Sequence, residues 1–140
     1  DLRLKKQMAT AAKLAKALEK NQYVLKVNHP GLESFPQHQL ALKLYRSNEE
    51  MTGMLSIVVP EDPAKIDEFM LRLELAHYAT TLGGIRTTLN HPVTSSHSHM
   101  PDADRRKMGI TPGMFRISAG IEDPDDLIAD FTQALEVFGK

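Results

Sequence analysis

A strand that leads into a helix is predicted by the stretch Met114-Phe115-Arg116-Ile117-Ser118-Ala119-Gly120-Ile121-Glu122-Asp123. Side chains alternate between the two faces of a strand, so Arg116 shares a face with Met114 and Ser118. The two apolar residues between them point to the other face. The pattern therefore predicts a strand with one apolar face and one face that carries an arginine.

Arg116 is an unusual residue for an apolar run. Its guanidinium group stays charged at any ordinary pH, and its five N–H donors need acceptors. An arginine held on a rigid strand suits bidentate binding of a carboxylate. A salt bridge to a nearby Glu or Asp explains the same residue without a ligand. The residues alone leave both interpretations open and favour the salt bridge.

Two Asp-Pro pairs predict helix starts further along the chain. Asp62 and Asp123 are suitable N-caps, and Pro63 and Pro124 fit the first helical position. An apolar stripe follows each pair at helical spacing and is expected to face the core. The stripes are Ile66, Phe69, Met70 and Leu73 in the first helix, and Leu127, Ile128, Phe131, Leu135 and Phe138 in the second.

The other elements follow from local patterns. Residues 2–20 are predicted to form a helix with lysines on its solvated side and an apolar stripe of Leu4, Met8, Ala11, Ala15 and Leu18. Short helices are expected after Pro36 and over 101–108. Strands are expected at 23–27, 54–59, 78–82 and 85–89, with 54–59 buried on both faces. Gly83-Gly84 is interpreted as a tight turn between the last two strands.

This alternation of strands and helices predicts the α/β class. The expected architecture is a two-layer sandwich, in which helices cover a small sheet that is mixed or mostly antiparallel. A chain of 140 residues is long enough for one domain with a substantial core and too short for a second.

Composition excludes several classes of protein. The net charge of -1 gives no general attraction to nucleic acid or to an anionic membrane, and the absence of cysteine excludes disulfides and thiolate metal sites. The sequence contains neither an apolar run of about 20 residues nor a secretory signal pattern. We therefore expect a cytoplasmic protein. Because the first residue is Asp1 and not Met, we also expect a fragment or a processed product.

Other candidate sites are weaker. His91, His97 and His99 lie close together in the polar loop 91–100 and suggest a zinc or nickel site, but no carboxylate stands at a familiar ligand spacing. A solvated loop with a structurally bonded His97 is the favoured interpretation. The acidic residues around Asp123 are explained by the dipole of the helix that follows.

Several segments, taken in order, carry a resemblance to one family. They are His29-Pro30-Gly31-Leu32 with Pro36-Gln37-His38, Gly53-Met54-Leu55-Ser56, Thr81-Leu82-Gly83-Gly84, His91-Pro92 with His97, Arg105 with Gly109-Ile110, and Phe115-Arg116-Ile117-Ser118 running into Gly120-Ile121-Glu122-Asp123. The series resembles the carboxy-terminal domain of the pyridoxal-phosphate-dependent enzymes of Cys/Met metabolism. Cystathionine γ-synthase, the cystathionine lyases and methionine γ-lyase belong to this group.

The resemblance implies a role for each matched residue. Arg116 matches the arginine that binds the α-carboxylate of the amino-acid substrate. Thr81 matches a position, usually serine, that faces the same carboxylate, and Thr80 matches a position that differs between lyases and synthases. Leu82 completes the implied substrate-binding set. Thr81, Arg86 in place of a common glutamate, and Asn28-His29 in place of a common tyrosine are departures from the family pattern.

The resemblance also implies that the cofactor-binding part of the enzyme is absent from this chain. In that family the Schiff-base lysine, the aspartate at the pyridine nitrogen and the phosphate-binding residues lie upstream of the matched region. Pyridoxal chemistry needs such a lysine, and no lysine here lies in a comparable motif. We expect residues 1–20 to be a connecting helix, residues 21–140 to be the substrate-side domain, and this segment to be inactive alone and unable to bind pyridoxal phosphate.

Two hypotheses from different classes remain. In the first, the chain is part of a lyase or transferase that acts on a sulfur amino acid, with its own amino-terminal cofactor domain as partner and a homotetramer as the assembly. In the second, it is a free-standing, non-catalytic interaction domain derived from that family. Which sulfur amino acid is used, and whether the β or γ carbon reacts, stay open.

Overall fold

The computed structural model describes residues 1–45, 47 and 49–139. The strands form one sheet in the order β1-β2-β5-β4-β3. Neighbouring strands are antiparallel except β3 and β4, which are parallel. The expected class, with a small and mostly antiparallel sheet, is confirmed. The strands are β1 Lys26–Asn28, β2 Met54–Val58, β3 His77–Tyr78, β4 Thr88–Asn90 and β5 Met114–Ser118.

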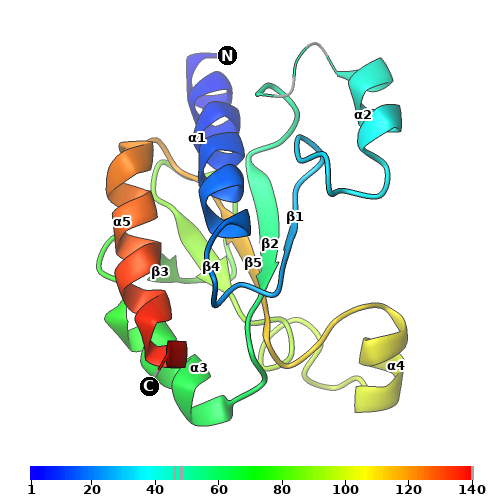
Figure 1. Cartoon of the computed structure of the whole chain (residues 1–140), viewed down its shortest axis with the longest axis vertical. Coiled ribbons are helices and arrows are strands. Elements are labelled where there is room, and N and C mark those ends of the chain that lie inside the picture. Colours follow the sequence, from blue (N-terminus) through cyan, green and yellow to red (C-terminus); the bar gives the residue numbers. More distant parts are fainter. Residues whose placement is uncertain (46, 48, 140) are drawn as a thin grey trace.

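Helices cover one face of this sheet (Figure 1). The long helices α1 and α5 pack on each other in front of the strands, and α3 joins them through Phe69, whose ring lies 5.2 Å from that of Phe115 in β5. The shorter α2 and α4 lie to the side (Figure 1). The helices are α1 Leu2–Glu19, α2 His38–Leu44, α3 Pro63–Arg72, α4 Asp102–Lys107 and α5 Pro124–Leu135, followed by the 3-10 turn η1 Glu136–Gly139.

The covered side of the sheet carries the hydrophobic core. We call it the core face, and its side chains are all buried against α1, α3 and α5. Phe115 and Ile117 are fully buried there, as the alternation in the sequence predicts. The core face consists of Val27, Leu55, Ile57, Leu89, Phe115 and Ile117.

Both predicted Asp-Pro helix starts are confirmed. The carboxylate of Asp62 accepts hydrogen bonds from the backbone N–H groups of Ala64 and Lys65, and that of Asp123 accepts one from Asp125 at 2.8 Å. These bonds satisfy N–H groups that the first helical turn cannot pair internally. The buried stripes follow, with Phe69 and Phe131 fully buried.

Three strand predictions were wrong in position. The first strand is Lys26–Asn28 rather than 23–27. In place of the two strands expected at 78–82 and 85–89, the structure has the shorter strands β3 and β4. Because β3 and β4 run parallel, Gly83-Gly84 is not a hairpin turn. Residues 79–87 form a loop because several of their polar groups bond to the segment after β5 instead of to a neighbouring strand.

Two burial predictions also need correction. In α1 the stripe begins later than expected: Leu4 is 54% exposed, whereas Leu14 is fully buried and Ala11 and Ala15 are buried as predicted. The sheet begins beside the middle of the helix, so the first turns of α1 extend beyond the core (Figure 1). The expectation that 54–59 is buried on both faces is wrong as well, because Met54, Ser56 and Val58 are only half-buried.

Within the described residues, no helix combines the length and hydropathy needed to cross a bilayer.

Candidate functional site

A row of polar side chains crosses the face of the sheet opposite the core. Strand pairing places Asn28 opposite Ser56, Ser56 opposite Arg116, and Arg116 opposite Asn90. Every member of the row has the register parity opposite to that of the buried apolar residues, so all lie on the second face. We call this side the polar face. The amide of Asn28 donates a hydrogen bond of 2.9 Å to Ser56 Oγ.

Arg116 lies near the centre of this row on β5, which pairs with a strand on each side. It is half-buried, and among the described residues it has no ion-pair or hydrogen-bond partner. The expected salt bridge to a nearby Glu or Asp is therefore absent from the described part of the chain. By contrast, Arg106 is paired with Glu61 and Asp102, and Arg72 with Glu68. Arg116 keeps a guanidinium available for an anion.

The loop 79–87 is anchored to the end of β5 beside this row. The backbone N–H of Gly83 donates to Ser118 Oγ at 2.9 Å, and Ile121 N–H donates to the carbonyl of Ile85 at 3.0 Å. Gly83 has φ +71°, a conformation that glycine adopts without steric cost. Gln7 of α1 holds the same loop from the other side through the carbonyl of Gly84.

Glu122 and Thr87 form the second anchor. The carboxylate of Glu122 accepts from the backbone N–H of Thr87 at 2.5 Å and from its hydroxyl at 2.8 Å. The same hydroxyl oxygen accepts from Gly120 N–H at 2.9 Å. A Cβ at Gly120 would lie 2.5 Å from the carbonyl oxygen of Ile85, so only glycine fits there. Glu122 thus fixes the loop, a role that the helix-dipole interpretation did not predict.

Thr80, Thr81 and Leu82 lie on the exposed part of this anchored loop. The hydroxyl of Thr88 donates to the carbonyl of Thr81 at 3.0 Å, and Thr88 pairs with Ser118 in the sheet. Ser118 is two residues from Arg116 on the same face. The fold therefore ties the backbone of the threonine pair to the row next to Arg116.

Two buried histidines hold the Pro-Gly turn beside β1. His29 Nδ1 accepts from Gly31 N–H at 3.0 Å, and its Nε2–H donates to the carbonyl of Thr52. His38 Nδ1–H donates to the carbonyl of Pro30 at 2.8 Å. Burial is the main cause that lowers the pKa of His29, with Lys16 adding to it and the bond to Thr52 opposing it. The neutral ring is therefore part of the fold.

The histidines of the 91–100 loop do not assemble into a metal site among the residues that the structure describes. Both ring nitrogens of His91 are engaged, Nδ1 with Thr94 and Nε2 with the carbonyl of Pro112 at 2.6 Å. The ring also stacks on Phe115 at 5.1 Å. His97 hydrogen-bonds its neighbour Ser96. The weakly ranked zinc or nickel hypothesis finds no support in this geometry.

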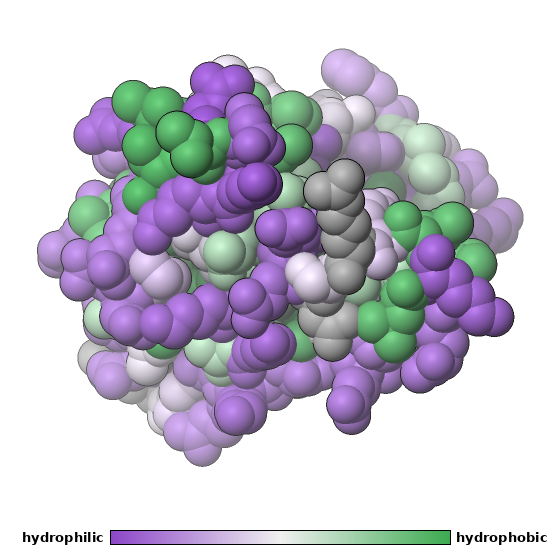
Figure 2. Space-filling view, turned by 90° about the horizontal axis from the view of Figure 1, so that it is seen from above, coloured by the Kyte–Doolittle hydropathy of each residue, from purple (hydrophilic) through white to green (hydrophobic). Residues whose placement is uncertain are grey.

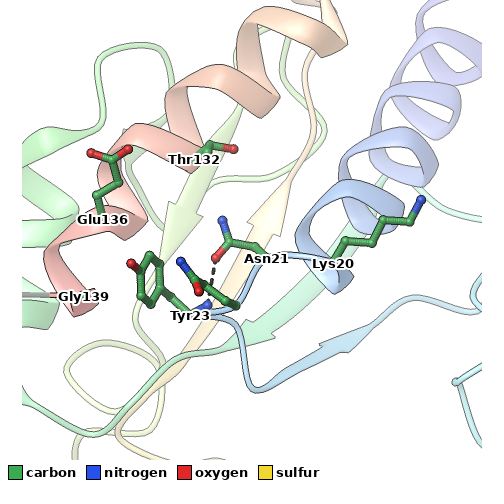
Figure 3. Close-up of a pocket in the computed structure, with 7 residues that line it drawn as sticks. Lys20, Asn21, Tyr23, Thr132, Glu136 and Gly139 are labelled. Atoms are coloured by element: carbon green, nitrogen blue, oxygen red, sulfur yellow. Dashed lines mark hydrogen bonds between the residues drawn. The ribbon is translucent and has the colours of Figure 1, made fainter.

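A hollow of about 620 Å³ lies elsewhere, at the carboxy-terminal end of α1 (Figure 3). Tyr23 N–H donates to Asn21 Oδ1 at 2.9 Å inside it, and Glu136 of η1 and Lys20 stand on opposite sides. No residue of the row around Arg116 lines this hollow. Its side chains are a solvated mixture without the paired acid and base that catalysis needs.

The polar row, the anchored loop and the Pro-Gly turn are the same segments that carried the family resemblance. Residues 1–136 match the model of the Cys/Met metabolism PLP-dependent enzymes. The chain belongs to this family. The resemblance stated from the sequence is confirmed, and members of this family use pyridoxal phosphate.

The relatives are sulfur amino-acid enzymes. The chain is 37% identical over 134 residues to a cystathionine beta-lyase of Coxiella burnetii, covering 96% of this chain and 34% of the relative. It is 35% identical over 140 residues to an L-methionine gamma-lyase of Treponema denticola, covering 100% of this chain and 34% of the relative. The chain thus spans about a third of the length of these relatives.

A solved structure confirms the fold. A cystathionine gamma synthase from Xanthomonas oryzae pv. oryzae, in complex with aminoacrylate and cysteine, superposes with a TM-score of 0.90 at 29% identity. The match covers 99% of this chain and 35% of the other. That part of a fold-type-I pyridoxal-phosphate enzyme therefore shares the two-layer architecture described above.

The positions of three lysines bear on whether the aldehyde of the cofactor could bind beside Arg116. Lys13 of α1 pairs with Asp125 and Lys107 of α4 with Asp104, each on the surface. Lys26 does lie on the polar face, but on β1, at the edge of the sheet and separated from Arg116 by β2. Lys13, Lys26 and Lys107 therefore do not lie beside Arg116. That this segment does not bind pyridoxal phosphate by itself stays a prediction.

Sequence reasoning missed two members of the row. Ser56 and Asn90 had no assigned role, because their importance depends on the register that sets them beside Arg116. The only signal in the sequence is a polar residue in an apolar strand, which Ser56 supplies within 54–59. Thr80, Thr81, Leu82 and Arg116 keep their assigned substrate-binding roles as predictions.

Proposed function

We propose that this chain is the substrate-side part of a pyridoxal-phosphate-dependent lyase or transferase of sulfur amino-acid metabolism. In this proposal residues 1–20 connect to an amino-terminal part that holds the cofactor, and residues 21–140 form the carboxy-terminal domain. The relatives named cystathionine beta-lyase and L-methionine gamma-lyase support this substrate class, as does the one-third of their length that the chain covers.

The observation that carries the proposal is the half-buried guanidinium of Arg116, which has no anionic partner among the described residues. Leaving a partly desolvated charge unpaired costs stability, so such a residue is retained when a ligand pairs with it. The planar fork matches a carboxylate with two parallel hydrogen bonds. The α-carboxylate of an amino acid is the ligand common to the substrates of these relatives.

Arg116 would fix the orientation of the substrate. Two hydrogen bonds to one carboxylate restrict rotation about the bond to Cα, and β5 holds the arginine because it pairs with a strand on each side. Thr81 would add a hydroxyl next to the carboxylate, and Thr80 and Leu82 would border the substrate side chain. The anchoring of their loop by Glu122 and Ser118 supports this assignment. Pyridoxal phosphate, held by the other part of the polypeptide, supplies the electron sink for chemistry at Cα.

Exposed apolar residues support association with further protein. Ile85 and Ile121, joined by a backbone hydrogen bond, and Leu82 on the same loop are all exposed, and so are Leu40 and Leu44 of α2. Figure 2, which views the molecule from above Figure 1, shows exposed hydrophobic residues near two opposite edges of this surface. We infer that they contact the cofactor-binding part and a second copy in a homo-oligomer. A free-standing interaction domain would use the same surfaces and is the alternative.

The decisive experiment uses the whole polypeptide that the gene encodes, loaded with pyridoxal phosphate. Arg116→Lys keeps the charge and removes the fork, and it is expected to raise KM for L-cystathionine or L-methionine at least about tenfold. Arg72→Lys is the matched control, because Arg72 pairs with Glu68 on the surface of α3. It should leave KM unchanged.

Three results would overturn the proposal. An open reading frame that starts near Asp1 would favour the free-standing domain. A longer polypeptide without cofactor absorbance after reconstitution would exclude the enzyme. A KM that responds equally to both lysine substitutions would remove the specific role of Arg116.

A further inference from the structure

Asn90 is the residue of the polar row whose chemistry is unexplained. It ends β4 and stands directly opposite Arg116 in the β4–β5 pair. The residue is 1% exposed, and both amide atoms, Oδ1 and Nδ2, lack a hydrogen-bond partner among the residues that the structure describes. Asn28, at the other end of the row, donates to Ser56. The amide of Asn28 is therefore paired within the row, whereas the amide of Asn90 has no partner in the described part of the chain.

A buried amide without partners is costly. Such a group loses its hydrogen bonds to water without a replacement, and a folded protein normally supplies one. Leucine or serine would avoid most of this cost at the same position. An asparagine at that position is explained if a partner reaches it when the site is in use.

Arg116 is the partner that the register offers. Side chains of directly opposed residues in an antiparallel pair have Cβ atoms about 5 Å apart, within reach of an amide and a guanidinium. A bidentate carboxylate uses two of the guanidinium N–H groups and leaves others without acceptors. The oxygen of a neutral amide can accept a hydrogen bond from one of these N–H groups. Because the amide has no charge, it does not compete with the substrate carboxylate for the positive charge of the guanidinium.

We propose that Asn90 is a positioning residue for Arg116: its Oδ1 accepts a guanidinium N–H and holds the fork toward the substrate carboxylate. The inference rests on the proposed function and adds a residue to the same site. A carboxylate in place of this amide would pair with Arg116 and displace the ligand. An amide orients the arginine and keeps its charge for the substrate.

The test is Asn90→Asp in the cofactor-loaded full-length protein. The change is nearly isosteric and puts a negative charge beside Arg116. KM for the amino acid is expected to rise about tenfold or more, because the new carboxylate competes with that of the substrate. The value of kcat, the cofactor absorbance and the melting temperature should stay close to those of the parent.

Asn28→Asp is the matched control. It adds the same charge to the same row, but on β1, with β2 between it and Arg116. Its effect on KM should be several-fold smaller than that of Asn90→Asp, because the new charge lies two strands from Arg116 and not directly opposite it. Equal effects of the two substitutions would mean that charge on this face matters and that contact with Arg116 does not, which would overturn the inference.

Asn90→Ser covers the case in which the aspartate variant does not fold. It removes the amide and leaves a small polar group, so KM should rise about threefold with kcat retained. Unchanged KM in this variant, with Arg116→Lys still raising KM, would refute the role of Asn90 and leave the proposed function intact. If Arg116→Lys itself has no effect, the proposed function fails first.

Discussion

The two faces of β5 differ in burial and in polarity. On the core face, Phe115 and Ile117 are fully buried and packed against helices. On the polar face, Arg116 is half-buried and has no ionic partner among the described residues, while Ser118 holds the loop 79–87. One strand therefore packs into the core on one side and, in the proposed function, binds the substrate on the other.

The two faces contribute differently to the stability of the fold. The core face depends on close packing, in which a lost methylene leaves a cavity. The polar face has a charge and an amide that lack partners among the described residues, an arrangement that gives no stability. Binding sites are often built at such a cost in stability, because groups that are already paired within the protein cannot pair with a ligand.

Phe115→Ala should have the largest effect on stability. The ring is fully buried and lies 5.2 Å from Phe69 and 5.1 Å from His91. Its loss is expected to reduce the free energy of unfolding by about 3–5 kcal/mol. Urea unfolding measures this. Met114→Ala, on the other face of the same strand, is the control and should lose less than half as much. Equal losses would show that the two faces do not differ in packing.

The pH dependence of stability tests His29, which is buried immediately after β1. The pKa of His29 is lowered by burial, so between that pKa and about 6.5 the unfolded chain binds more protons than the folded one. Stability should therefore be complete above about pH 6.5 and fall as the pH decreases through this window.

His29→Asn isolates this contribution. An asparagine Oδ1 can accept from Gly31 N–H in place of Nδ1, but it does not titrate. Urea unfolding at several pH values should show a steeper loss of stability toward low pH in the parent than in the variant. Parallel curves would assign the pH dependence to other groups.

Arg116→Met should have the smallest effect on stability and a large one on binding. It removes a charge that has no partner in the described part of the chain and retains the aliphatic volume, so the free energy of unfolding is expected to change by less than about 0.5 kcal/mol. Thermal unfolding measures this. A loss of more than about 2 kcal/mol would mean that Arg116 is a structural residue, and the contrast between the faces would disappear.

Some of this protein was predictable because it depends on neighbours in sequence. The strand at Met114–Ser118 and the helix starts at Asp62 and Asp123 came from alternation and capping, and all three are confirmed. The ordered motifs carried the family resemblance, which is also confirmed. The candidate role of Arg116 came with that resemblance and still awaits its test.

Only the tertiary structure decided the rest. The order β1-β2-β5-β4-β3 and the parallel pairing of β3 with β4 join residues far apart in the chain, and local preferences say nothing about them. The same long-range register placed Asn90 and Ser56 beside Arg116. Among the described residues, it placed no Asp or Glu close enough to pair with Arg116. The sequence determined which face Arg116 occupies, since side chains alternate along any strand. What stands next to it depended on how distant strands align.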